Sequence, residues 1–129
     1  MEAIGFFREL RHGLPNGPLL KDAVSDPLPE GDREAIARYL LACPVIYASG
    51  TRAVDALHPE SGEVSGVHLH SDGTYVWPED AAYYVRRYGA RLPLGFLRHV
   101  ADVPSIPTDE DLDLDEVEVQ IGDAMAAQR

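Results

Sequence analysis

Two short runs of strand-forming residues flank a tight-turn sequence near the middle of the chain. The runs are VSGVHLH at 64–70 and TYVW at 74–77, with Ser71-Asp72-Gly73 between them. Asp followed by Gly between two such runs is the strongest short-range signal of a β-hairpin. The sequence therefore predicts a hairpin over about 64–77, which commits the middle of the chain to an antiparallel sheet.

The register of this hairpin depends on the length of its turn. A three-residue loop with Gly73 in the left-handed conformation pairs Leu69 with Tyr75. Four apolar side chains then share one side of the ribbon: Val67, Leu69, Tyr75 and Trp77. A two-residue Asp72-Gly73 turn shifts the pairing by one residue and groups the histidines at 68 and 70 with the two aromatic residues. We favour the first register because it separates apolar from mixed side chains more cleanly.

Apolar spacing also predicts the elements on either side of the hairpin. Helices are expected over 2–12, over 32–43 with Asp32 as N-cap, over 78–88 with Pro78 first and Gly89 after the end, and directly after Pro93. Short strands are expected at 45–48 and 52–57. This order predicts an α+β fold, a small mainly antiparallel sheet with helices packed on one face. Trp77, Tyr84 and Cys43 are expected in the core.

The C-terminal segment 108–129 is strongly acidic, and its pattern is ambiguous. TDEDLDLDEVEV alternates like a strand, whereas Leu114, Val117, Ile121 and Met125 fit a helical stripe, and Thr108 with Asp111 resembles a capping pair. We favour a helix over 115–127, because a solvated helical face tolerates dense like charge better than paired strands do. Seven acidic residues and no basic residue lie in 109–118: Asp109, Glu110, Asp111, Asp113, Asp115, Glu116 and Glu118.

Length and charge limit the classes of partner. The chain has 129 residues, 22 acidic against 11 basic, and a formal net charge of −11. We expect one domain over 1–129 that binds neither nucleic acid nor an anionic membrane, since both are polyanions. A single cysteine excludes an internal disulfide, and the N-terminus lacks a basic stretch followed by an uninterrupted apolar run. A cytoplasmic location is therefore expected.

Few residues suggest chemistry. His68 and His70 are two apart on a predicted strand and Asp72 follows, a spacing that resembles the start of a metal-ligand set and makes these three residues an alternative metal site. Cys43 lies on a predicted apolar stripe, where a thiol is inert. The chain contains no G-x-S-x-G elbow and no Gly-rich phosphate loop after a strand. We therefore expect a protein that is not an enzyme and uses no cofactor.

Residues 71–100, SDGTYVWPEDAAYYVRRYGARLPLGFLRHV, have a recognisable pattern. A DGT turn, an aromatic strand ending in Trp-Pro, a helix with paired tyrosines and then Leu-Pro resemble small actinobacterial proteins, some of which are similar to immunity proteins of polymorphic toxin systems. The matching residues are Asp72, Gly73, Trp77, Pro78, Tyr84, Leu92 and Pro93. These residues are structural in character, so the resemblance implies a shared fold more than a shared activity.

Together these features predict a non-enzymatic cytosolic protein-interaction module. The seven acids between 109 and 118 are the expected contact residues for a basic protein partner. The resemblance implies an immunity-type inhibitor as the specific form. Two alternatives stay open: a small-molecule or metal-binding domain that uses the hairpin histidines, and a structural homo-oligomer.

Overall fold

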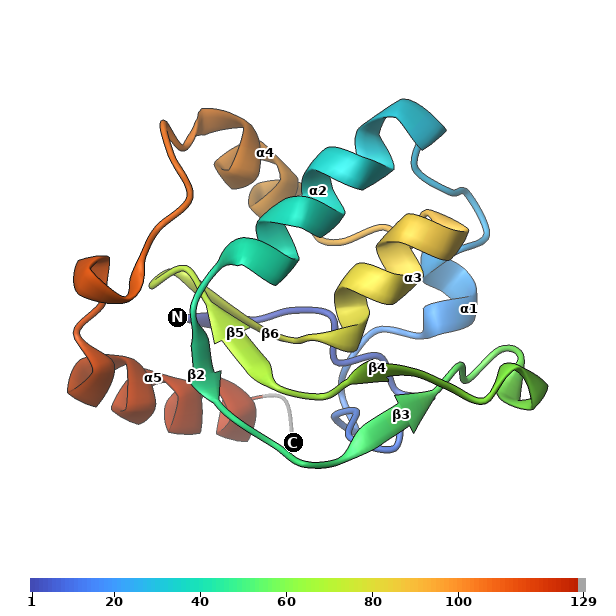
Figure 1. Cartoon of the computed structure of the whole chain (residues 1–129), viewed down its shortest axis with the longest axis horizontal. Coiled ribbons are helices and arrows are strands. Elements are labelled where there is room, and N and C mark those ends of the chain that lie inside the picture. Colours follow the sequence, from blue (N-terminus) through green and yellow to red (C-terminus); the bar gives the residue numbers. More distant parts are fainter. Residues whose placement is uncertain (128–129) are drawn as a thin grey trace.

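The structure, a computed structural model, describes residues 1–127 and is built on a four-stranded mixed sheet (Figure 1). The strands follow the order β1 (Glu2–Ala3), β6 (Tyr75–Pro78), β5 (Leu69–Ser71) and β2 (Val45–Tyr47). β1 runs parallel to β6, and the other two pairings are antiparallel. β3 (Arg52–Val54) and β4 (Glu63–Gly66) form a separate antiparallel pair. The α+β class and the mainly antiparallel sheet are confirmed.

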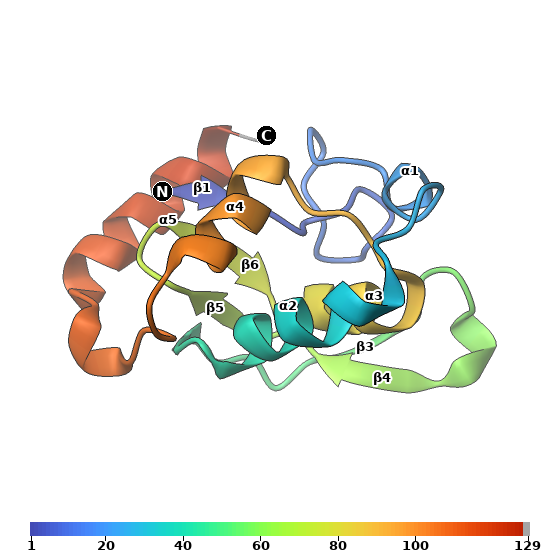
Figure 2. The same cartoon turned by 90° about the horizontal axis from the view of Figure 1, so that it is seen from above.

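Helices cover the sheet unequally. α2 (Glu30–Ala42), α3 (Asp80–Tyr88) and α4 (Leu94–Asp102) pack on one face, as expected, around a core centred on Trp77. α5 (Leu114–Ala127) contacts β1 and lies on the other side of the strands, below them in Figure 1 (Figure 2 gives the view from above). The one-turn α1 (Leu20–Ala23) follows the N-terminal segment. Within residues 1–127, no helix combines the length and apolar character needed to cross a membrane.

The predicted helix over 2–12 is wrong. Glu2 and Ala3 pair with β6 instead, and the amide of Ile4 donates to the carbonyl of Val76 at 2.9 Å. Gly5 then turns the chain at φ +74°, so close to α3 that a Cβ on Gly5 would stand 2.8 Å from that of Ala81. The apolar spacing nevertheless identified buried residues, because Phe6, Phe7 and Leu10 all lie in the core. The apolar spacing correctly indicated which residues are buried, but it did not indicate their backbone conformation.

The predicted hairpin forms, but in a different register. Leu69 pairs with Pro78 and His70 with Trp77, which leaves Gly73 and Thr74 as the turn. His70 therefore shares a face with Trp77, the grouping of the register that we did not favour. Segregation of apolar and polar residues did not predict the register because both faces of this sheet are covered. The helices around Trp77 cover one face, and Phe6 and Leu14 pack with Ala3 and Val76 on the other.

The remaining boundaries are close to those predicted. α2 begins at Glu30 after Pro29, two residues before the N-terminus that Asp32 suggested. Pro78 ends β6 and does not begin α3, because Leu69 pairs with it and the amide of Glu79 donates to the carbonyl of His68. Gly89 ends α3 at φ +67°, as expected. α5 confirms the helix at 115–127, although the Thr108–Asp111 capping pair belongs to a separate 3-10 turn, Asp109–Asp111.

The predicted core positions of three residues are confirmed, since Trp77 and Tyr84 have no exposed surface and Cys43 is buried. Burial also raises the pKa of the Cys43 thiol to about 12, which agrees with an inert side chain. Of the expected stripe on α5, Val117 is buried and Leu114 is exposed. The side chains of Ile121 and Met125 lie outside the part that the structure describes.

We expect Trp77→Ala to lower the free energy of unfolding by about 3–5 kcal/mol. The ring is fully buried between Tyr39 and Phe96, and its Nε1–H donates to the carbonyl of Leu40 at 3.0 Å. Denaturant unfolding measures the change. Tyr47→Ala removes an aromatic ring that is 64% exposed, so it serves as the control with a change within about 0.5 kcal/mol. Equal effects of the two variants would contradict the placement of Trp77.

Candidate functional site

A groove lies between α5 and the edge strand β2, with a volume of about 340 Å³. We call it the acidic groove. Its wall is mainly apolar, with two carboxylates from the first turns of α5, and comprises Val45, Ile46, Tyr47, Leu69, Leu114, Asp115, Val117 and Glu118. Three large apolar residues of its wall are exposed: Val45, Tyr47 and Leu114. Exposed apolar area bordered by charge is typical of surfaces that bind other proteins.

The seven predicted contact acids are all exposed, and two of them, Asp115 and Glu118, line this groove. Within residues 1–127 none of the seven forms an ion pair. Their hydrogen bonds are local: Asp111 caps Thr108, Asp113 accepts from the amide of Glu116, and Glu116 accepts from Gln120. Asp115 and Glu116 lie in the first turn of α5, where the helix dipole favours negative charge. The structure thus leaves this charge uncompensated by neighbouring cations.

The turn of the hairpin carries the segment that leads into α5. Leu112, between the 3-10 turn and α5, packs directly on Gly73, and a Cβ at Gly73 would lie 3.0 Å from Leu112 Cδ2. Gly73 also has φ +93°, which an L side chain rarely adopts. Both facts require glycine here, so this one residue allows the hairpin to turn and α5 to approach it.

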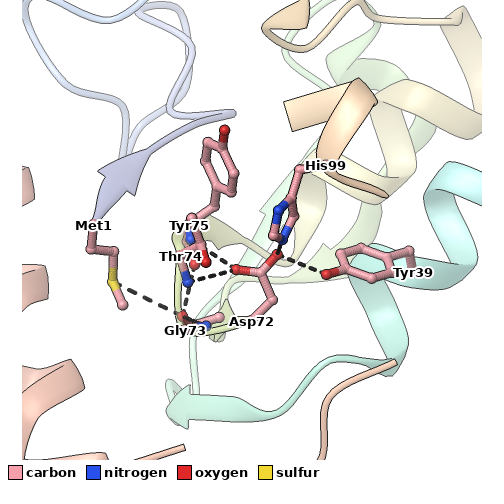
Figure 3. A network of polar contacts seen from close by, with 8 residues as sticks. Met1, Tyr39, Asp72, Gly73, Thr74, Tyr75 and His99 are labelled. Atoms are coloured by element: carbon pink, nitrogen blue, oxygen red, sulfur yellow. Dashed lines mark hydrogen bonds and ion pairs between the residues drawn. The ribbon is translucent and has the colours of Figure 1, made fainter. Parts of the chain in front are cut away.

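Asp72 fixes the same turn from the other side (Figure 3). Its Oδ1 accepts hydrogen bonds from the amides of Thr74 and Tyr75 at 2.9 and 2.8 Å. Its Oδ2 accepts from the Tyr39 hydroxyl at 2.7 Å and lies 3.0 Å from His99 Nε2. Burial, together with the nearby Asp72 carboxylate, raises the pKa of the Tyr39 hydroxyl. Asp72 therefore connects the turn to α2 and α4.

The structure does not bring the three alternative metal ligands together. His68 Nδ1 accepts from the amide of Ser49, and Asp72 faces Tyr39 and His99. His70 is buried between the Cys43 carbonyl at 2.7 Å and Glu79 Oε2 at 3.0 Å. Among the residues described, no group of three or more His, Cys, Asp or Glu side chains could hold a metal ion. The spacing was misleading because the side chains of His68, His70 and Asp72 each contact a different part of the chain.

Sequence reasoning missed a second set of histidine–carboxylate contacts. The positions of Glu79 and Asp80 suggest that both serve the dipole of the following helix, but each faces a histidine, Glu79 pairing with His70 and Asp80 with His12. His12 and Asp80 are 68 positions apart, and their atoms lie 2.8 Å apart. No local pattern links residues at that separation. The only signal in the sequence was that two consecutive acids, Glu79 and Asp80, precede the helix, whereas one acid would be enough to favour the positive end of the helix dipole.

A tyrosine cluster surrounds a second buried carboxylate, that of Asp55. The hydroxyls of Tyr83 and Tyr88 donate to Asp55 Oδ2, and the amides of Leu57 and His58 donate to Oδ1. Burial opposes ionisation, but these four donors outweigh it and hold the pKa of Asp55 below its ordinary value of 3.8. The cluster joins the loop after β3 to α3, so its role is to support the fold.

Comparisons of the chain with protein-family models, with curated proteins and with solved structures find no significant match.

We expect Gly73→Ala to destabilise the protein by about 1–3 kcal/mol and to loosen the segment 103–113, because the new Cβ is strained and meets Leu112. Denaturant unfolding and the rate of limited proteolysis in that segment measure the two effects. Gly50→Ala is the matched control, since a Cβ at Gly50 meets no atom within 4 Å and its φ is not positive. An effect of Gly73→Ala no larger than that of the control would contradict the contact.

We expect Asp55→Asn to destabilise the protein by roughly 2–3 kcal/mol at neutral pH, since it weakens charge-assisted hydrogen bonds. The folded-state pKa of Asp55 is depressed, so its contribution is complete above 3.8 and is lost as pH falls through the lower folded-state value. The difference between wild type and variant should therefore shrink in acid. Urea unfolding from neutral pH to below 3 tests this, with exposed Asp102→Asn as control. A constant difference would contradict it.

Proposed function

We propose that the protein is a non-enzymatic, cytoplasmic interaction module whose acidic groove binds a basic segment of another protein. The observation that carries the proposal is the coincidence of two features at one place. The segment 109–118 carries seven exposed carboxylates without ion pairs to any described residue, and two of them, Asp115 and Glu118, line an apolar groove with exposed Tyr47 and Leu114. Neither feature alone identifies a contact surface.

The two features have different tasks. Burial of the apolar wall favours association because apolar area is removed from water, and the losses of freedom on binding oppose part of this gain. The carboxylates attract a basic partner at long range and align it, which raises the association rate and excludes acidic competitors. The complementary segment has an apolar side chain for the groove and Lys or Arg residues that reach Asp115 and Glu118 on its border.

A protein partner of different sequence fits this surface better than a second copy of the chain. Two copies that met through the acidic groove would bring fourteen like charges together, and juxtaposed like charges oppose association. The resemblance of residues 71–100 to immunity-type proteins supports a toxin domain as the partner. A toxin that acts on nucleic acid carries a basic surface for its polyanionic substrate, and such a surface is complementary to this groove.

We expect neutralisation of the acidic surface to slow association with the partner. The test variant carries Asn or Gln at the seven acids between 109 and 118. Partner proteins are captured from the host at low ionic strength and identified, and their association rates are then measured against salt concentration. The variant should associate about tenfold or more slowly at low salt and show a flatter salt dependence, because steering depends on these charges.

A charge-matched control variant distinguishes the effect of where the neutralised acids lie from the effect of the change in net charge. It neutralises seven other exposed acids that form no ion pair with a residue in 1–127: Glu2, Asp22, Glu30, Asp32, Glu60, Asp102 and Asp123. This control should retain the wild-type association rate, and circular dichroism should show that both variants fold. If the test variant and wild type give the same rate curves, or if both variants slow equally, the proposed surface is wrong.

A further inference from the structure

A second cleft lies away from the acidic groove, and a histidine–aspartate pair lines it. It is bounded by residues 9–12 of the N-terminal segment, by Thr51 and β3, by Val67, and by the first residue of α3, Asp80. Its volume is about 350 Å³, within the range of small-molecule sites. We call it the N-terminal cleft. Apolar walls come from Leu10, Val54 and Val67, and the polar groups lie between them.

Asp80 is the unusual residue of this cleft. Its carboxylate has no exposed surface, Oδ1 contacts His12 Nε2 at 2.8 Å, and Oδ2 has no hydrogen-bond partner in the described residues. A buried carboxylate oxygen without a donor is uncommon, since leaving such a group unsatisfied costs about 1–3 kcal/mol or more. The fold has therefore kept a buried charge where a well-packed apolar residue would be more stable, which is typical of a functional position.

Asp80 determines how His12 faces the cleft. A carboxylate accepts hydrogen bonds, so the Nε2 atom of His12 carries the proton that is directed at Asp80. His12 Nδ1 then remains as the ring atom available to a ligand, and it has no partner within residues 1–127. The His12 side chain is 25% exposed, and it borders both this cleft and the neighbouring hollow. When the ring is neutral and Nε2 donates to Asp80, Nδ1 is an acceptor for a hydroxyl or ammonium proton.

Two arginines, Arg11 and Arg52, line the cleft and offset the carboxylates of Glu9 and Asp80. Arg11 is exposed, lines the cleft and forms no ion pair with any described residue. Arg52 lies at the same cleft and contacts Glu63 at 3.4 Å with both side chains exposed, a weak pairing. Glu9, the other acid of the lining, is already occupied by the amides of Leu20 and Lys21. Arg11 is thus available to an anionic group.

We propose that the N-terminal cleft binds a small anion that carries a hydroxyl or ammonium group next to its charge. The anionic group, a phosphate or a carboxylate, pairs with Arg11, and the neighbouring donor bonds to His12 Nδ1. Asp80 acts as a positioning residue that fixes the ring of His12. This site shares no lining residue with the acidic groove, so it is independent of the proposed protein partner.

Calorimetric titration of the full chain with matched probes tests the proposal. Glycerol 3-phosphate and lactate represent the phosphate and carboxylate forms. Inorganic phosphate and acetate carry the charge without the donor, and glycerol carries the donor without the charge. We expect at least one of the two hydroxylated anions to bind about tenfold more tightly than its plain counterpart, equivalent to about 1.4 kcal/mol. Glycerol should not bind. If each hydroxylated anion binds no more tightly than its plain counterpart, the cleft is not a specific site.

Three substitutions assign the roles of the residues. Arg11→Gln should weaken binding of the preferred probe about tenfold or more without changing the melting temperature, since Arg11 is exposed. His12→Gln should remove the preference for the hydroxylated probe and retain weak binding of the plain anion. Arg98→Gln alters another exposed arginine, on α4, and should leave binding unchanged. An equal loss in Arg11→Gln and Arg98→Gln would indicate nonspecific attraction and would overturn the proposal.

Discussion

Asp72 places one buried carboxylate where three parts of the chain meet. Its two oxygens hold the amides of the hairpin turn, the Tyr39 hydroxyl of α2 and the His99 ring of α4. Removing a carboxylate from water is unfavourable unless its lone pairs are satisfied, and here four donors satisfy them. The arrangement holds the turn rigid. Leu112 packs on Gly73 of the same turn, so the turn that Asp72 holds also supports the segment that leads into α5 and the acidic groove.

The sequence was most informative where apolar spacing and turn chemistry act locally. α4, α5 and the left-handed end of α3 at Gly89 follow from those rules, as do the buried positions of Trp77 and Cys43. The N-terminal segment shows the limit. Its apolar residues are buried as a helical stripe would be, yet Gly5 and the pairing of β1 with β6 exclude a helix. Spacing reports which residues avoid water, and long-range pairing decides their conformation.

For the same reason, the candidate sites could be predicted only in part from the sequence. The seven acids of 109–118 are visible in the sequence, but the apolar groove that two of them line forms only when the fold brings α5 near β2. The histidine–carboxylate pairs were even harder to predict from the sequence. His12 meets Asp80 and His99 meets Asp72 across large separations, and no spacing rule relates such residues. The hairpin histidines, two positions apart in the sequence, formed an alternative ligand set, and the structure gives them separate partners.

The parallel pairing of β1 with β6 also affects the order in which the chain can fold. Residues 2 and 3 are synthesised before their partners at 75 and 76, which follow more than seventy residues later. Contacts between such distant segments form slowly, because the intervening loop must close first. During synthesis the apolar residues Phe6 and Phe7 therefore have no sheet to pack on until the hairpin is complete. Burial of Phe6 and Phe7 in a nascent chain therefore requires that the hairpin in the middle of the chain has already been made.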